Sequence, residues 1–221
     1  MNDERKWENV EEFINKKVVK PSLFLSDTLE VSQREGLPSI NVQAPEGKLM
    51  SILVRSINAK RSLEIGVLGG FSGLWILSGM KNGKLVGLEK SEKHARVANE
   101  NFIRAGYGED VNIIVGEALT SLNNMIKEHV QAFDFILIDA DKKPYLHYFE
   151  RAMELSHPGT IIFIDNMVWN GEIINSENQS DDNAGIKRLY DPLEIEERVD
   201  GTVIQTVGSK GYDGFAVLRV L

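Results

Sequence analysis

Residues Arg61 to Ser72, RSLEIGVLGGFS, are the stretch that decides the fold. Ser62 to Gly66 is typical of a short buried strand, and a glycine-rich turn and a new helix follow it directly. Glycines permit positive φ and let a ligand approach the backbone, while the start of a helix offers unpaired N–H groups. The stretch therefore predicts a nucleotide-type site in an α/β protein. Its glycines lack the G-x-G-x-x-G spacing of dinucleotide-binding proteins, which favours a different nucleotide-like ligand.

Composition limits the classes of protein to consider. The 221 residues are 42% hydrophobic, so we expect one domain over residues 1–221, with a helical appendage at 1–40 and a Rossmann-like core at 41–221. The sequence has no cysteine, which excludes thiolate chemistry and is typical of a cytoplasmic protein. A charged N-terminus and the lack of an apolar run of ~18 residues argue against a signal peptide or a membrane span. The formal net charge of -8 disfavours nucleic acid as a partner.

Predicted helices and strands alternate along most of the chain. Two helices separated by Pro21 occupy residues 6–36, and a further helix begins near Pro45. Strands are predicted at residues 62–66, 84–89, 111–115, 133–139 and 160–165, with helices at 71–80, 91–105, 119–129 and 145–155 between them. Apolar strands separated by helices predict a parallel sheet that is covered on both faces.

The chain after Asp165 is less regular. Residues 170–183 are polar and predict a surface loop that could act as a lid, and a helix follows at about 185–199. Strands are expected at residues 203–207 and 215–221. The connection between them is too short for a crossover helix, so we expect an antiparallel pair at one edge of the sheet.

Acidic residues lie near the ends of successive predicted strands. They are Glu64, Glu89, Asp139 and Asp165. Ligands of open parallel sheets bind outside the carboxyl ends of the strands. Glu89 lies 23 positions after Gly66, near the ~20-residue offset of an acidic residue that accepts ribose hydroxyls. The alternative is that Glu89 caps the helix that follows it.

A second group of residues has the chemistry of a cation site. Asp139, Asp165 and Asn166 offer two carboxylates and an amide oxygen, a set that suits Mg²⁺, Mn²⁺ or Ca²⁺ better than zinc. The alternative is helix capping and a polar turn. Lys142 follows on the same predicted loop. It is either a solvated charge at a helix start or a partly desolvated general base with a lowered pKa.

Taken together, these motifs resemble the S-adenosylmethionine-dependent, divalent-metal-dependent O-methyltransferases that include catechol and caffeoyl-coenzyme A O-methyltransferases. The segments that carry the resemblance are INVQAPEGKLM, LEIGVLGGFS, VGLEK, VGEA, LIDADKKPY and FIDNMVWNG. They cover nearly the whole chain after about residue 36. The resemblance implies a class I methyltransferase fold, with a mostly parallel seven-stranded sheet and an antiparallel C-terminal strand.

The resemblance also implies roles for individual residues. Those implied to bind S-adenosylmethionine are Val42, Glu64, Gly66, Val67, Gly70, Ser72, Glu89, Ala118 and Asp139. Asp139, Asp165 and Asn166 match the ligands of a divalent cation, for which Mg²⁺ is the first choice and Mn²⁺ or Ca²⁺ the alternatives. Asp139 and Lys142 match the catalytic residues, with Lys142 as the base. The sequence departs from the family's pattern in two places. Gly69 occupies a position that is often filled by a larger residue, and residues 208–214 look lengthened relative to the family's short final turn.

The implied reaction moves a methyl group from S-adenosylmethionine to a hydroxyl of a small, vicinal-dihydroxy aromatic acceptor, in a homodimer. One alternative is an NAD-dependent oxidoreductase, which the missing G-x-G-x-x-G disfavours. Another is a non-catalytic or regulatory S-adenosylmethionine-binding protein, which the intact Asp139, Lys142, Asp165 and Asn166 disfavour. RNA methylation conflicts with the net charge.

Overall fold

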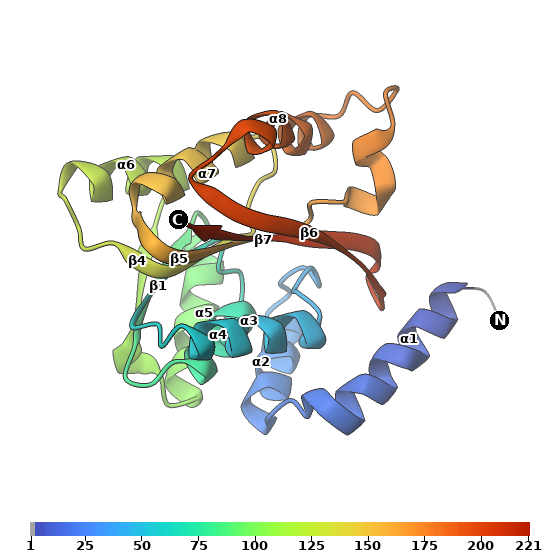
Figure 1. The fold of residues 1–221 in the computed structure, drawn as a ribbon. Coiled ribbons are helices and arrows are strands. Elements are labelled where there is room, and N and C mark those ends of the chain that lie inside the picture. Colours follow the sequence, from blue (N-terminus) through green and yellow to red (C-terminus); the bar gives the residue numbers. More distant parts are fainter. Residues whose placement is uncertain (1–2) are drawn as a thin grey trace.

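A seven-stranded sheet forms the centre of the computed structural model, which describes residues 3–221 (Figure 1). The strand order is β3-β2-β1-β4-β5-β7-β6. The strands are β1 (Arg61–Ile65), β2 (Lys84–Glu89), β3 (Val111–Val115), β4 (Phe133–Ile138), β5 (Ser156–Ile164), β6 (Val199–Gly208) and β7 (Gly211–Val220). Strands β1 to β5 run parallel, while β7 pairs antiparallel with both β5 and β6. The predicted mostly parallel sheet with an antiparallel C-terminal strand is confirmed.

Helices cover both faces of this sheet (Figure 1). On one face lie α3 (Ala44–Ser56), α4 (Phe71–Gly79) and α5 (Glu92–Arg104), together with the N-terminal α1 (Asp3–Ile14) and α2 (Leu23–Arg34). On the other lie α6 (Ala118–Lys127), α7 (Tyr145–Glu154) and α8 (Asp181–Ile195). Shorter helical pieces are η1 (Asn15–Val19), η2 (Gly108–Asp110) and η3 (Trp169–Ile174).

The sequence of β4, FDFILI, explains why helices are needed on both sides. Ile136 and Ile138 pack into the hydrophobic cluster under α6 to α8, whereas Phe135 and Leu137 pack into the cluster under α3 and α4. All four side chains are fully buried. Each buried side chain of this size contributes about 1.5–3 kcal/mol to folding. The central strands are therefore held in place on both faces, and the loops at their carboxyl ends start from fixed positions.

Three differences from the predicted elements lie in the C-terminal part. The last helix begins at Asp181, four residues earlier than predicted, because the Ser180 side chain caps it by accepting a hydrogen bond from the Asn183 N–H at 3.3 Å. Part of the predicted loop at 170–183 is helical. The predicted connection between the last two strands is also shorter in the structure, because most of residues 208–214 belongs to the strands. Strands β6 and β7 pair as far as Gly208 and Gly211, so a two-residue turn joins them.

Candidate active site

The glycine turn after β1 is packed against the loop that follows β4. Gly66 has φ +96°, and its N–H donates to the Leu88 carbonyl at 3.0 Å. A Cβ on Gly66 would stand 2.0 Å from the Asp139 carbonyl oxygen, so no side chain fits there. Gly70, with φ +84°, is the N-cap of α4 and packs on Phe102. The turn thus brings the start of α4 and the end of β4 to one place.

Glu89, at the end of β2, fastens this turn. Its Oε2 accepts hydrogen bonds from the N–H groups of Val67 at 3.2 Å and Leu68 at 2.9 Å, and its Oε1 accepts from the Ser91 N–H at 2.9 Å. An ionised carboxylate has about four acceptor positions, so it retains capacity for a ligand. The helix that follows is capped by Ser91 rather than by Glu89, because the Ser91 side chain accepts from the His94 N–H. Ser91 is therefore the N-cap of α5, and Glu89 contributes to the start of this helix only by accepting a hydrogen bond from the Ser91 N–H.

Glu64 lies one layer behind the turn and is fully buried. Its Oε1 accepts a hydrogen bond from the Ser72 hydroxyl, while its Oε2 is buried without a partner among the described residues. Burial raises the pKa of Glu64 to about 8, against the opposing effect of the Ser72 hydrogen bond. Glu64 therefore orients the Ser72 hydroxyl, while its Oε2 lies against Gly73 in the first turn of α4.

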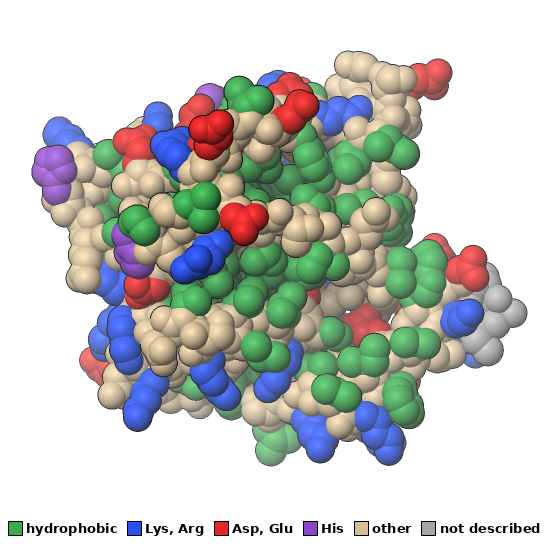
Figure 2. Space-filling model, viewed as in Figure 1, with side chains coloured by type: hydrophobic (Ala, Val, Ile, Leu, Met, Phe, Trp, Pro, Cys, Tyr) green, Lys and Arg blue, Asp and Glu red, His purple; other side chains and the backbone are tan. Residues whose placement is uncertain are grey.

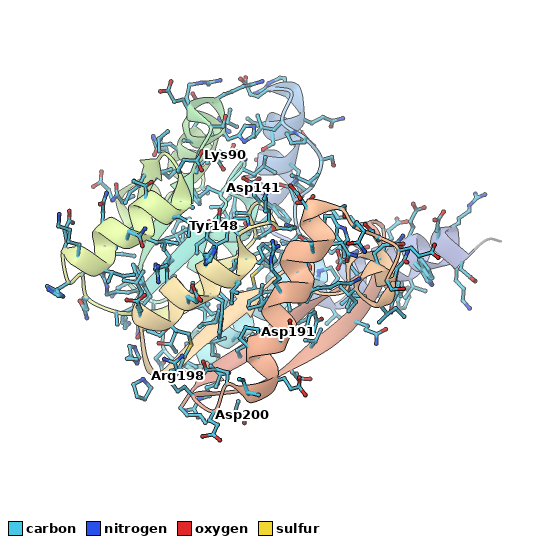
Figure 3. All side chains as sticks on the ribbon, turned by 90° about the horizontal axis from the view of Figure 1, so that it is seen from above. Lys90, Asp141, Tyr148, Asp191, Arg198 and Asp200 are labelled. Atoms are coloured by element: carbon cyan, nitrogen blue, oxygen red, sulfur yellow. The ribbon has the colours of Figure 1, made fainter. Side chains whose placement is uncertain are left out.

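A cavity of about 220 Å³ lies above this turn. The predicted cofactor residues that line it are Val42, Gly66, Val67, Ser72, Glu89, Ala118 and Asp139. Glu64 and Gly70 do not line it and act from behind, through Ser72 and α4. Lys90 and Asp141 form an ion pair at 2.6 Å on the rim, near Tyr148 (Figure 3). The backbone groups of the turn and the partly free Glu89 fit a nucleoside that carries an amino acid tail.

The predicted cation ligands come together beside this cavity. Asp139 and Asp165 follow the adjacent strands β4 and β5, and the Asp165 N–H donates to the Ile138 carbonyl at 3.0 Å. Asn166 has φ +57°, and its Nδ2 donates to Oδ2 of Asp213 at 2.9 Å. Because Asp213 accepts from the amide nitrogen, the amide oxygen of Asn166 is left for another partner.

The electrostatics of this acidic cluster favour a cation. Burial and the nearby Asp139 raise the pKa of Asp165 to about 7. Burial, together with Asp165 and Asp139, also raises the pKa of Glu46, on α3, well above its usual range. Within residues 3–221 no three His, Cys, Asp or Glu side chains are grouped tightly enough to form a metal site alone. The predicted set of two carboxylates and one amide nevertheless fits Mg²⁺, which binds few protein oxygens and keeps several waters.

Lys142 lies against this cluster. Its Nζ donates to Oδ1 of Asp139 at 3.0 Å and stands over the rings of Tyr145 and Trp169. Burial alone would lower the pKa of Lys142, but its contacts with Tyr145 and Asp139 more than offset that effect and raise the pKa. The alternative of a lowered pKa applies to Lys142 beside a bound cation and stays a prediction. Without a cation, Lys142 is an ammonium group paired with Asp139.

Two residues of the site were missed by sequence reasoning. Glu46 lies in the first turn of α3, where an acidic residue looks like an ordinary helix-start charge. Asp213 lies 47 positions after Asn166 and looks like part of a polar turn. Besides Asn166, Asp213 accepts hydrogen bonds from the N–H groups of Trp169 and Gly214, both at 2.8 Å. Only the antiparallel return of β7 beside β5 brings Asp213 to the cluster.

The fold and the site together define a class of protein. A Rossmann-like sheet with a nucleoside-sized cavity and an acidic cluster at the carboxyl ends of its strands is typical of α/β enzymes with a nucleotide-type cofactor. Within residues 3–221 no helix is long and apolar enough to cross a membrane.

Comparisons with known proteins identify the family. The family model described as O-methyltransferase matches residues 16–219. A catechol O-methyltransferase of Niastella koreensis is 40% identical over 186 residues, which cover 84% of each chain. An O-methyltransferase of Bacillus cereus, solved in complex with SAH, is 40% identical with a TM-score of 0.95 and covers 98% of this chain and 99% of that chain. TomG of Streptomyces achromogenes, solved with SAM, is 33% identical with a TM-score of 0.94, covering 100% of this chain and 99% of the other. The protein belongs to the O-methyltransferase family.

Proposed function

We propose that this protein transfers the methyl group of S-adenosylmethionine to a hydroxyl of a small aromatic acceptor that carries two vicinal hydroxyls, with the help of a divalent cation. The observation that carries the proposal is the double position of Asp139. It lines the nucleoside-sized cavity, and it belongs to the acidic cluster with Asp165 and Asn166. A methyl donor in the cavity and an acceptor at the cluster would therefore meet at Asp139.

The chain's own residues orient the two reactants. Glu89 accepts the ribose hydroxyls with the acceptor positions that the turn does not use, and Ala118 lies beside the base. Ser72 and Val42 line the cavity and would enclose the amino acid tail, while Glu64 orients the Ser72 hydroxyl from behind. Holding donor and acceptor in line accounts for much of the rate enhancement in reactions of this kind.

Asp139, Asp165 and Asn166 would hold the cation, preferably Mg²⁺, with Mn²⁺ or Ca²⁺ as alternatives. A cation held there would bind the two acceptor hydroxyls and lower the pKa of the attacking one. Lys142 Nζ is 3.0 Å from Asp139, so a cation held there would repel its ammonium group and favour loss of the Lys142 proton to solvent. The neutral amine would then be placed to accept the proton of the attacking hydroxyl.

Two substitutions test the proposed assignments. Asp139→Ala is expected to abolish metal-dependent methyl transfer, because it removes a cation ligand. Glu89→Ala is expected chiefly to weaken S-adenosylhomocysteine binding in calorimetry, because it removes the ribose acceptor and loosens the turn. Full activity of Asp139→Ala in EDTA would refute the role of the cation. Unchanged cofactor affinity of Glu89→Ala would refute the ribose assignment.

The same proposal covers assembly and location. We expect one methyltransferase domain with residues 1–40 as its appendage, acting as a homodimer. Val10, Phe13, Val18 and Leu23 expose between 50% and 83% of their surface, and hydrophobic side chains gather along α1 in Figure 2. Such a patch supports association through the N-terminal helices. The absence of cysteine supports the cytoplasm as the compartment.

A further inference from the structure

A second cavity, of about 370 Å³, lies between α1, α3 and the β6–β7 hairpin. Its walls are mostly apolar and are formed by Trp7, Val10, Ile14, Pro45, Leu49, Val207 and Phe215. Glu11 on α1 accepts a hydrogen bond from the Ser209 N–H at 2.6 Å, which ties the tip of the hairpin to α1 and closes one side. In Figure 2 the surface is hollowed between α1 and the hairpin, and acidic side chains are visible there.

The segment at residues 40–46 separates this cavity from the cofactor cavity. Ile40, Asn41 and Val42 line the cofactor cavity, whereas Gln43 and Glu46 line the second one. The two cavities therefore share this short stretch of chain as a wall. None of the predicted cation ligands lines the second cavity, so an acceptor there would reach the acidic cluster past Glu46.

Two acidic residues, Glu11 and Glu46, line the second cavity, and Glu46 is the one that also faces the acidic cluster. Its carboxyl hydrogen-bonds with that of Asp165, and Asp139 and Asp213 are close enough to raise its pKa, so it lies beside the acidic cluster. Its Oε1 is buried and has no hydrogen-bond partner among the described residues. The other groups that face Glu46 are the Asp165 carboxyl, with which it shares a hydrogen bond, and the Lys210 side chain. A buried acceptor without a partner costs roughly 1–3 kcal/mol, so Oε1 is available for a hydroxyl that enters this cavity.

We propose that the second cavity holds the ring and the apolar substituent of the acceptor, and that Glu46 determines specificity by accepting a hydrogen bond from a hydroxyl of that acceptor. This inference rests on the proposed function and adds the acceptor class to it. The acceptor is a dihydroxy aromatic with an apolar substituent, because the walls that extend from Glu46 towards Trp7 and Val10 are apolar. The hydroxyl bound by Glu46 fixes which of the two oxygens faces the methyl donor.

The test uses a catechol with a propyl group para to one hydroxyl as probe, and Glu46→Met as the main variant. Methionine matches the length of glutamate but has no oxygen to accept the hydrogen bond. Glu46→Gln keeps a carbonyl oxygen, and Glu12→Met removes a charge from an exposed position of α1 that lines neither cavity. The measurements are KM for the probe, the ratio of the two monomethyl isomers, and calorimetric binding of the probe and of S-adenosylhomocysteine.

We expect Glu46→Met to weaken probe binding and raise KM by about tenfold or more, and to move the isomer ratio towards equality. Glu46→Gln should restore KM to within about threefold, and Glu12→Met should match the wild type. S-adenosylhomocysteine affinity should be unchanged and the melting temperature at least maintained, because a buried carboxyl with an unpartnered oxygen has been removed. In the wild type, unsubstituted catechol should bind at least about tenfold more weakly than the probe, because it has no propyl group to bury against the apolar walls.

Several outcomes would overturn the inference. An unchanged KM and isomer ratio in Glu46→Met would show that Glu46 does not contact the acceptor. Equal affinity for catechol and the probe would show that the substituent does not lie in the second cavity. A wild type that binds the probe but transfers no methyl group would refute the proposed function alone, and the binding series would still decide the role of Glu46. A wild type that neither binds nor methylates the probe would refute both.

Discussion

At the scale of single residues, the site depends on side chains that orient other side chains through hydrogen bonds. Asp213 accepts hydrogen bonds from the Asn166 amide and from the N–H groups of Trp169 and Gly214, and so fixes both the amide and the turn around it. Partners of this kind orient a cation ligand without touching the cation, and removing one typically costs 10–100-fold in metal affinity.

Asp213→Asn should therefore weaken Mn²⁺ binding by about tenfold or more, because the new amide no longer selects one orientation of Asn166. Mn²⁺ titration followed by electron paramagnetic resonance measures this without turnover. Asp191→Asn is the matched control, since Asp191 is exposed on α8 (Figure 3). Wild-type Mn²⁺ affinity in Asp213→Asn would contradict the positioning role.

Glu64 gives a second prediction at this scale. Its pKa is raised to about 8 in the folded protein from 4.5, so between these values the folded state holds a proton that the unfolded state has lost. The contribution of Glu64 to stability therefore falls as pH rises through this window. Relative to wild type, Glu64→Gln should gain at least about 2 kcal/mol of unfolding free energy between about pH 5 and about pH 9. A pH-independent difference between the two proteins in urea unfolding would contradict it.

At the scale of elements, the glycine turn links β1, α4 and β4. Gly66 and Gly106 both have positive φ, but a Cβ would meet the Asp139 carbonyl at Gly66 and nothing within 4 Å at Gly106. Gly106→Ala should cost about 1–2 kcal/mol from backbone strain alone. Gly66→Ala should cost clearly more and should also abolish S-adenosylhomocysteine binding. Equal losses in denaturant unfolding, with binding retained, would show that the turn is not closely packed.

The elements also show what the sequence could predict. The strands 84–89 and 111–115 agree with β2 and β3 to the residue, because apolar runs with polar flanks mark the core of a parallel sheet. The sequence predicts strands at 203–207 and 215–221, whereas β6 begins four residues earlier at Val199 and β7 four residues earlier at Gly211. The outer half of this hairpin is only partly buried, so its sequence, TVGSKGYDG, carries turn residues and no apolar alternation.

The residues of the candidate site also separate into those that the sequence could predict and those that it could not. Glu89, Asp139 and Asp165 were predictable because each stands at the end of a strand, and parallel strands bring their ends together. Glu46 and Asp213 were not predictable, because α3 and β7 reach the cluster only through tertiary packing. The pKa of Lys142 depends on the same packing, since the contacts that raise it come from neighbours on two loops and α7.

At the scale of the whole molecule, association through α1 is open to a direct test. Light scattering should give twice the 24.8 kDa chain mass, and Phe13→Lys with Val18→Lys should shift the protein towards the monomer by placing charges in the apolar patch. A wild-type mass of 24.8 kDa would contradict the homodimer.

The central claim is that one site joins a methyl donor in the cofactor cavity to a diol at the acidic cluster. The most direct measurement is transfer of labelled methyl from S-adenosylmethionine to a panel of vicinal aromatic diols and their single-hydroxyl analogues, with Mg²⁺ and with EDTA. We predict labelled product from the diols with Mg²⁺, little from the analogues, and none in EDTA. Equal transfer in EDTA, or equal transfer to single-hydroxyl acceptors, would contradict the account.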